Sequence, residues 1–226
     1  MRYLRARLDQ PEWMRHPMQE FLASSEAMER EELLAWNLSR DDVQYALFFA
    51  VGDVEAYRER IDDVEAIRRY ELTPVDEESF YVYVCQEYTE SDVAFFGAFA
   101  ELNLVVVPPL VYDGDGRGEV TVVGPSEALT ELVVALRERA GVGVDVLELG
   151  RYDRRQGTAV GELTDRQYEA AEMATRLGYY DVPRSASLVD VAEELGVAEA
   201  TASELLRRAE SNLMGRLFGT EYGSSR

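Results

Sequence analysis

The sequence predicts an α+β fold, in which a duplicated ferredoxin-like or ACT-like antiparallel-sheet domain is followed by an all-α helix-turn-helix domain. Three observations support this fold class. Within residues 1–150, stretches that alternate apolar and polar residues, typical of strands, are interspersed with segments of helical periodicity. The order strand, helix, two strands, helix, strand occurs roughly twice in this part of the chain. Residues 187–218 then contain two helical segments that meet at Gly196, a residue that tolerates a tight turn.

Length and composition set the first bounds. A chain of 226 residues has room for one or two domains, and 46% hydrophobic residues are enough for a sizeable core. No run of ~18 consecutive apolar residues is present, so no transmembrane helix and no membrane partner are expected. The N-terminus lacks the apolar stretch of a signal peptide. Cys85 is the single cysteine, which rules out an intramolecular disulfide, and the expected compartment is the cytoplasm.

The charge of the chain is strongly one-sided. The formal net charge is -21, the isoelectric point is about 4.4, and all 23 basic residues are arginine. Such a chain repels itself and DNA at low ionic strength. At ~1 M salt the Debye length falls to ~3 Å, which screens this repulsion. The composition therefore favours an archaeon that accumulates salt, and the alternative is codon bias acting on an ordinary acidic protein.

The first 150 residues are expected to alternate between strands and helices. Alternating patterns predict strands at residues 1–10, 32–39, 43–52, 66–73, 80–87, 104–112, 119–124 and 142–150. Helical spacing of apolar residues predicts helices at 17–29, 53–64, 91–102 and 126–140, the last with Ser126 as its N-cap. In the third helix, Phe95, Phe96 and Phe99 form an aromatic face that is expected to be core rather than a ligand site.

Two parts of this region have the same local pattern. Residues 52–73 and 124–150 each begin with glycine, continue as a short helix and end as a strand. The segment DGDGRG at 113–118 is rich in turn-forming residues and is expected to join two strands in a hairpin. It resembles the start of a calcium-binding loop, but the glutamate needed at the twelfth position is missing. The repeated order of glycine, helix and strand at 52–73 and 124–150 therefore predicts two similar halves with helices on one face of each sheet.

The domain plan has four parts. We expect a sensor or dimerisation domain at 1–150, a linker at 151–162, a helix-turn-helix domain at 163–219 and a tail at 220–226. In the linker, Arg154 and Arg155 either contact a phosphate or are solvated charges. Of the net charge, -4 falls on residues 163–219 and -17 on residues 1–162.

The C-terminal domain has clear signals for helix ends. Thr164 and Gln167 are spaced as a capping box, and Gly178 is expected to end the first helix. Ser187 is expected to cap the second helix and Gly196 to end it. The third helix is expected to turn one apolar face inward, formed by Ala202, Leu205, Leu206, Ala209, Leu213 and Leu217.

The run from residue 163 to 213 resembles a known module. The segments LTDRQ, GYYDVPR, LVDVAEELGV and SELLRRAESNL together resemble the helix-turn-helix of the haloarchaeal bacterio-opsin activator (Bat) family. Residues 1–150 resemble the domain that often precedes this module in that family. The resemblance implies a DNA-binding transcriptional regulator of a halophilic archaeon, and not an enzyme. Its partner would be double-stranded DNA, read by a recognition helix at about 199–217.

By the docking geometry of the helix-turn-helix motif, seven residues are expected to face DNA. They are Glu199, Ala200, Thr201, Ser203, Glu204, Arg207 and Arg208. Arginine can contact guanine with both ends of its guanidinium or clamp a phosphate, and hydroxyl groups suit phosphate oxygens. The alternative is that the two arginines pair along the helix with Glu204, Glu210 or Ser211.

Two function classes remain open from the sequence. The first is a sequence-specific regulator whose N-terminal domain senses a ligand, forms a homodimer or contacts another protein. The second is a helix-turn-helix protein-interaction module that binds a protein, such as a basal transcription factor, without touching DNA. Ala198, Glu199 and Ala200 favour the second class, because the resemblance leads us to expect hydroxyl and amide groups there.

No constellation of residues indicates catalysis, and no cofactor or metal is expected. His16 precedes a proline and is expected in a loop. Cys85 lies on the same strand face as Tyr81 and Tyr83, where it is either a half-buried structural residue or a redox-sensing thiol. The motifs of the common hydrolases and nucleotide-binding proteins are absent from the sequence.

Overall fold

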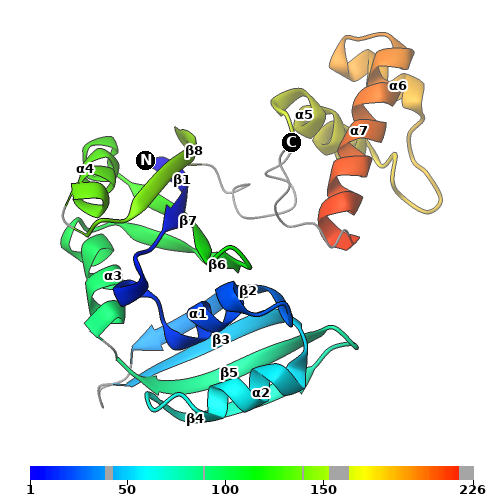
Figure 1. The fold of residues 1–226 in the computed structure, drawn as a ribbon. Helices are drawn as coiled ribbons and strands as arrows, with labels where there is room; N and C mark the ends of the chain where they lie inside the picture. Colours follow the sequence, from blue (N-terminus) through cyan, green and yellow to red (C-terminus); the bar gives the residue numbers. More distant parts are fainter. Residues whose placement is uncertain (39–42, 89, 139, 153–162, 219–226) are drawn as a thin grey trace. The chain divides into compact units, whose positions relative to one another are not determined.

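The computed structural model describes residues 1–38, 43–88, 90–138, 140–152 and 163–218 (Figure 1). The chain separates into two compact units, Met1–Tyr152 and Asp153–Arg226. Residues 153–162 of the expected linker, including Arg154 and Arg155, lie outside the described residues, as does the expected tail at 220–226.

The first unit is built on one eight-stranded sheet in which all neighbouring strands are antiparallel. The strand order is β4-β5-β3-β2-β6-β7-β1-β8. The strands are β1 (Arg2–Asp9), β2 (Met28–Leu38), β3 (Val43–Gly52), β4 (Ile67–Pro74), β5 (Ser79–Glu87), β6 (Val105–Asp113), β7 (Arg117–Gly124) and β8 (Gly143–Arg151).

Four α-helices and one short 3-10 helix accompany this sheet. They are η1 (Glu12–Met14), α1 (Pro17–Ser24), α2 (Val54–Asp62), α3 (Glu90–Glu101) and α4 (Ser126–Glu138). The predicted α+β class with an antiparallel sheet is confirmed. The hairpin at 113–118 is also confirmed, with the Asp113 carboxylate accepting hydrogen bonds from the backbone N–H groups of Asp115 and Arg117.

The two halves of the sheet are nested in the chain. One half has the order β4-β5-β3-β2, and the other has the order β6-β7-β1-β8. They meet where β2 pairs with β6, from Arg30↔Asp113 to Leu33↔Leu110. The first half is inserted between β1 and the remaining strands of the second half. The similar segments at 52–73 and 124–150 become α2–β4 and α4–β8, which lie at equivalent outer edges of the sheet (Figure 1).

The helices cover one face of the sheet, as the alternation along β5 shows. Phe80, Val82 and Val84 are buried towards the helices, whereas Tyr81 and Tyr83 on the opposite face are 40% and 41% exposed. The buried side chains of sheet and helices form one continuous hydrophobic cluster. Phe95 and Phe99 belong to it, as the aromatic pattern of that helix predicts, and the half-buried Phe96 packs against it. Cys85, on the Tyr81 and Tyr83 face, is buried rather than half-buried.

Two local predictions in the first unit were wrong. The first helix ends at Ser24, because Ser25 is extended and its hydroxyl accepts a hydrogen bond from the Ala27 N–H, so residue 28 begins a strand. His16 lies in the loop before α1, as expected, and also caps that helix: its Nδ1 accepts a hydrogen bond from the Met18 N–H at 3.2 Å. Ser126 is the first residue of its helix and not the residue before it.

The described part of the second unit, residues 163–218, consists of three helices that all contact one another, α5 (Asp165–Leu177), α6 (Leu188–Leu195) and α7 (Glu199–Phe218) (Figure 1). Thr164 and Ser187 cap the first two helices, as expected. The expected capping box of Thr164 with Gln167 is present, and Ser187 forms a second one with Asp190. Gly178 and Gly196 end them with φ values of 82° and 66°, in the left-handed region that favours glycine.

None of the helices in the described part of the chain combines the length and apolarity needed to cross a bilayer.

Candidate nucleic-acid interface

The three helices pack around a core of small side chains. Ala170, Ala174, Val191 and Leu206 are at most 2% exposed. Alanine at the contact points lets the helix axes approach closely, and larger apolar residues surround this centre. After Gly196, the Val197 N–H donates to the Ala192 carbonyl at 3.0 Å, and α7 begins two residues later. The sequence therefore sets a short, rigid turn between α6 and α7.

The core fixes which side of α7 faces outward. Successive residues of an α-helix are rotated by about 100°, so the buried Ala202, Leu206 and Ala209 lie on one side. The opposite side consists of exposed residues, namely Ala200, Ser203, Glu204, Arg207 and Ser211. Leu217 was expected inward but is 62% exposed, because the helix extends past the other two and has nothing described to pack against there.

All seven residues that the sequence singled out for DNA lie on α7 and are exposed. Ala200, Ser203, Glu204 and Arg207 share the outer face, which extends over about two helical turns. The other three, Glu199, Thr201 and Arg208, flank it. The helix thus presents these side chains to solvent as one surface, which we call the outer face of α7.

The two arginines of this surface have different surroundings. Arg208 donates to Glu204 at 2.6 Å, across one helical turn. Both side chains are more than half exposed, so the pair adds only a few tenths of a kcal/mol, about 0.3–0.5. Arg207 makes no hydrogen bond or ion pair with any described residue. The sequence suggested a pair between Arg207 and Glu204, but the four-residue spacing to Arg208 is the one that forms.

Sequence reasoning missed the contacts that hold α7 in place. The Tyr180 hydroxyl, in the loop between α5 and α6, donates to Glu210 of α7 at 2.7 Å. Burial and this carboxylate raise the pKa of Tyr180, so the phenol stays protonated. Asn212 donates to Gln167 at 3.4 Å and so joins α7 to α5. The sequence signal for these contacts was the pair of tyrosines, Tyr179 and Tyr180, directly after Gly178. Their contact residues could not be inferred, because they lie too far along the sequence.

The same loop carries a further cation. The Arg184 guanidinium lies 4.5 Å from the centre of the Tyr179 ring. Cation–π contacts at exposed sites are worth about 0.5–1 kcal/mol, and this one holds the arginine beside the loop. Arg176 of α5 pairs with Glu194 of α6 at 3.8 Å. Among the basic residues named here, Arg207 is therefore the one without a partner among the described side chains.

Three packed helices with a short glycine turn and an exposed third helix define the helix-turn-helix class of DNA-binding domains. Comparison with family models agrees, because residues 163–215 match the model described as HTH DNA binding domain. Residues 16–152 match HVO_0513_N, a model of an N-terminal domain, which covers more than half of the chain. The chain belongs to this family of haloarchaeal regulators with a Bat-type helix-turn-helix. It is a DNA-binding transcriptional regulator and not an enzyme.

Named relatives agree with this assignment. The chain is 28% identical over 183 residues to the dimethyl sulfoxide reductase transcriptional activator of Halobacterium salinarum, covering 74% of this chain and 78% of that one. It is 32% identical over 133 residues to the protein of the same name in Haloferax volcanii, covering 55% and 61%. A third relative, the transcriptional regulator NarO of Haloferax volcanii, is 34% identical over 97 residues, covering 41% and 46%.

Proposed function

We propose that this regulator reads a specific DNA sequence by placing α7 in the major groove. The observation that supports this most is the position of Arg207, which is exposed, unpaired among the described residues and central on the outer face. An unpaired guanidinium loses no intramolecular ion pair when it contacts guanine O6 and N7 or a phosphate. In this proposal residues 163–219 form the DNA-binding domain and residues 1–150 the sensor or dimerisation domain, with 151–162 as linker.

The other outer-face residues take supporting roles. Thr201 and Ser203 donate to phosphate oxygens, Glu199 accepts from cytosine N4, and Glu204 holds Arg208 in the free protein. Ala200 contacts a thymine methyl group, and Arg208 reaches a phosphate once it leaves Glu204. Only arginine and glutamate contacts carry strong base discrimination in this set. The operator is therefore expected to contain guanine at the position that faces Arg207 and cytosine at the position that faces Glu199.

The acidic chain sets unusual conditions for binding. With net charge -21, few counterions are released when the protein meets DNA, so high salt weakens binding less than it weakens that of a basic protein. Screening at molar salt also removes the repulsion between the acidic first unit and the DNA backbone. The regulator thus acts in a cytoplasm of molar salt, where the DNA lies.

A homodimer fits both the operator geometry and the exposed sheet face. Tyr81 and Tyr83 are partly exposed. Tyr83 stacks on Tyr45 of the neighbouring strand with 6.0 Å between ring centres, and Tyr81 packs against Phe49 in a tilted arrangement at 5.4 Å. Aromatic side chains are enriched at protein interfaces. A two-fold pair would place two copies of α7 about one DNA turn apart.

Sedimentation in molar KCl should give a dimer for the wild type and a monomer for Tyr81→Arg/Tyr83→Arg. A wild-type monomer would contradict this part of the proposal.

The names of two relatives suggest the sign of regulation. Both are named as transcriptional activators of dimethyl sulfoxide reductase. We infer that this chain also activates transcription, and that promoters of such reductase genes are the first to examine. A basal transcription factor is the natural second partner of an activator.

Chromatin immunoprecipitation from cells tests the proposal. Wild type is compared with Arg207→Ala/Arg208→Ala and with a control, Arg166→Ala/Arg176→Ala, which removes the same charge from α5. Sharp promoter peaks that vanish in the first variant and persist in the second would support direct reading by α7. Peaks that persist in both would mean that DNA is reached through a partner. Absence of peaks for the folded wild type would favour the protein-interaction module instead, which the Ala198, Glu199 and Ala200 side chains also fit.

A further inference from the structure

The first unit contains a pocket between its helices and its sheet, separate from α7. The empty space between its lining residues is about 540 Å³, which includes open solvent. Apolar side chains form most of the wall. Of the lining residues, His16, Phe48 and Phe96 are half-buried, and Val82 and Val84 of β5 are buried.

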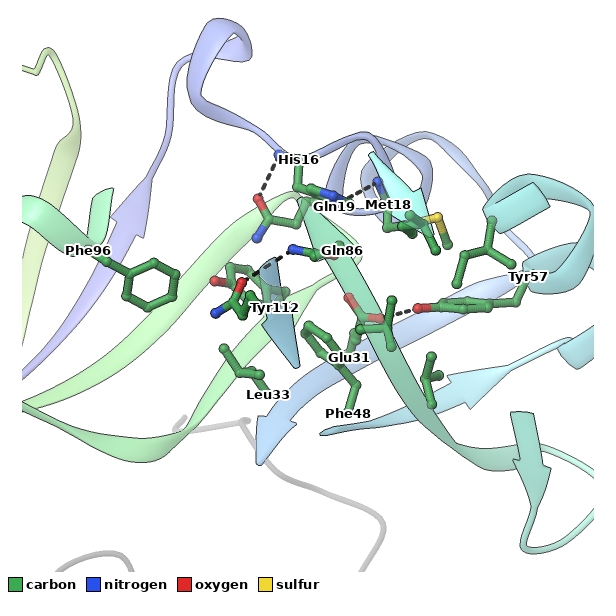
Figure 2. Close-up of a pocket in the computed structure, with 15 residues that line it drawn as sticks. His16, Met18, Gln19, Glu31, Leu33, Phe48, Tyr57, Gln86, Phe96 and Tyr112 are labelled. Atoms are coloured by element: carbon green, nitrogen blue, oxygen red, sulfur yellow. Dashed lines mark hydrogen bonds between the residues drawn. The ribbon is translucent and has the colours of Figure 1, made fainter. Parts of the chain in front are cut away.

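Polar groups are concentrated on the inner wall. Glu31 of β2, Gln44 of β3 and Gln86 of β5 are 3%, 3% and 6% exposed, although each carries a polar side chain. Gln44 and Gln86 are direct cross-strand partners, and the Gln86 amide donates to the Gln44 carbonyl oxygen at 3.4 Å. Figure 2 shows Glu31 and Gln86 in the pocket, with Phe48 and Tyr112 also in view. Buried polar groups are costly unless they have partners, so this grouping needs an explanation.

Of these three side chains, Glu31 has the largest free-energy cost of burial, because it is the one that can carry a charge. Its carboxylate accepts one hydrogen bond from the Tyr57 hydroxyl at 2.5 Å (Figure 2). It forms no ion pair with any described residue, and the neighbouring Arg30 pairs instead with Glu29 and Glu32. Burial raises the pKa of Glu31 to about 7, although the Tyr57 hydrogen bond opposes this shift. A carboxylate in this position lacks a positive partner, and the pocket provides space for one.

The walls beside Glu31 suit an organic cation. Phe48 is a diagonal neighbour of Glu31 on the same face of the sheet, since Glu31 pairs with Ala50 and Leu33 with Phe48. Phe96 and Tyr112 add two further aromatic rings to the lining. Aromatic rings attract ammonium groups through the negative face of the π-system, and this attraction is strongest where water is excluded. Inorganic cations prefer several oxygen ligands, which an apolar wall does not supply.

We infer that the pocket formed by Glu31, Tyr57, Phe48, Phe96 and the Gln44–Gln86 pair binds a small organic ammonium ion. The ammonium group lies against the Glu31 carboxylate, its alkyl substituents contact the aromatic and aliphatic walls, and a polar substituent reaches the Gln44 and Gln86 amides. The ligand supplies the charge that Glu31 lacks within the described chain. This inference concerns the first unit alone and does not depend on how α7 contacts DNA.

The test uses the full-length protein in molar KCl with choline as the probe. The matched compound is its uncharged isostere, in which carbon replaces the ammonium nitrogen, so shape is kept and charge is removed. Binding is followed by isothermal titration calorimetry and by chemical-shift changes of the first unit. Choline should bind at least tenfold more tightly than the isostere. Equal affinity for the two compounds, or no binding of choline, would overturn the inference.

Two variants locate the binding. Glu31→Gln keeps the size and a hydrogen-bonding group for Tyr57 and should lower choline affinity at least tenfold, leaving the isostere unaffected. Glu29→Gln makes the same charge change at an exposed position of the same strand outside the pocket, and should bind choline as the wild type does. Phe48→Leu removes one ring and should weaken choline more than the isostere. Choline binding that survives Glu31→Gln in a folded protein would show that the carboxyl is buried for structural reasons only.

Discussion

Arg208 and Glu204 form an ion pair of 2.6 Å across one turn of α7, and Arg207, the adjacent residue, has no such partner among the described residues. The two consecutive arginines therefore differ in whether contact with DNA would require breaking an ion pair within the protein. Arg208 must first separate from a carboxylate, whereas Arg207 is available at once. The difference follows from helix geometry, because a spacing of four residues brings side chains together on one side of the helix.

Replacing Glu204 should strengthen DNA binding. Glu204→Gln removes a negative charge from the outer face of α7 and releases Arg208, while the side chain keeps its size. We expect a gain of about 0.5 kcal/mol, or roughly twofold to threefold in affinity, from an exposed pair of this kind. Fluorescence anisotropy with an operator fragment in molar KCl measures it, with Glu172→Gln on α5 as the charge-matched control. Weaker binding in Glu204→Gln would instead assign Glu204 a direct base contact.

Removing the Tyr180 hydroxyl should destabilise the second unit. Tyr180→Phe loses the hydrogen bond to Glu210, which links the loop after α5 to α7. A partly exposed hydrogen bond of this type is worth about 1 kcal/mol. Chemical denaturation followed by circular dichroism measures the loss. Tyr179→Phe is the control, because it keeps the ring under Arg184. Equal stability of wild type and Tyr180→Phe would show that the contact does not hold α7.

Glycine is needed at the turn of the motif for its backbone and not for space. A Cβ at Gly196 would meet nothing within 4 Å, but φ is 66°, which disfavours other residues. Gly196→Ala should therefore cost about 1 kcal/mol. Gly215 in α7 is equally open but helical, so Gly215→Ala should stabilise by about 0.5–1 kcal/mol. Thermal unfolding should shift in opposite directions for the two variants, and a shift in the same direction would contradict this reasoning.

The stability of the first unit should depend on the ionisation of Glu31. The pKa is about 7 in the folded state and 4.5 for the ordinary group, so the folded state binds more protons between these values. The free energy of unfolding then falls as the pH rises through about 7, by about 3 kcal/mol over the whole window. In Glu31→Gln the side chain stays neutral at every pH, so the free energy of unfolding of the variant does not fall for this reason. Unfolding curves from about pH 5 to pH 8 should show the variant gaining stability relative to wild type. A difference that does not change with pH would contradict the assignment.

Much of the fold could be predicted because its signals are local. Thr164 with Gln167, and Ser187 before an apolar stretch, mark helix starts in the sequence itself, and Gly178 and Gly196 mark the ends. Strand alternation is equally local, as in Phe80–Val84. The nesting of the two halves was not predictable, because it depends on β1 pairing with β7 and β8, more than a hundred residues away.

The two sites also differ in whether local sequence patterns could predict them. The outward residues of α7 follow from helical spacing once Ala202 and Leu206 are placed inside. The pocket at Glu31 does not, since Tyr57 and Gln86 reach it from other elements and acidic residues are too common in this chain for one to stand out. His16 escaped notice as a cap because histidine is an uncommon residue for that role.

The most direct measurement compares the affinities of Arg207→Ala and Arg208→Ala for the operator that chromatin immunoprecipitation identifies. Anisotropy titrations in molar KCl would use this operator and versions with single base changes. We expect Arg207→Ala to lose about 1–3 kcal/mol, roughly fivefold to 150-fold in affinity, and to lose its preference for one guanine. Arg208→Ala should weaken binding less and keep the preference. Unchanged affinity and base preference in a folded Arg207→Ala protein would contradict the proposal that the outer face of α7 reads DNA.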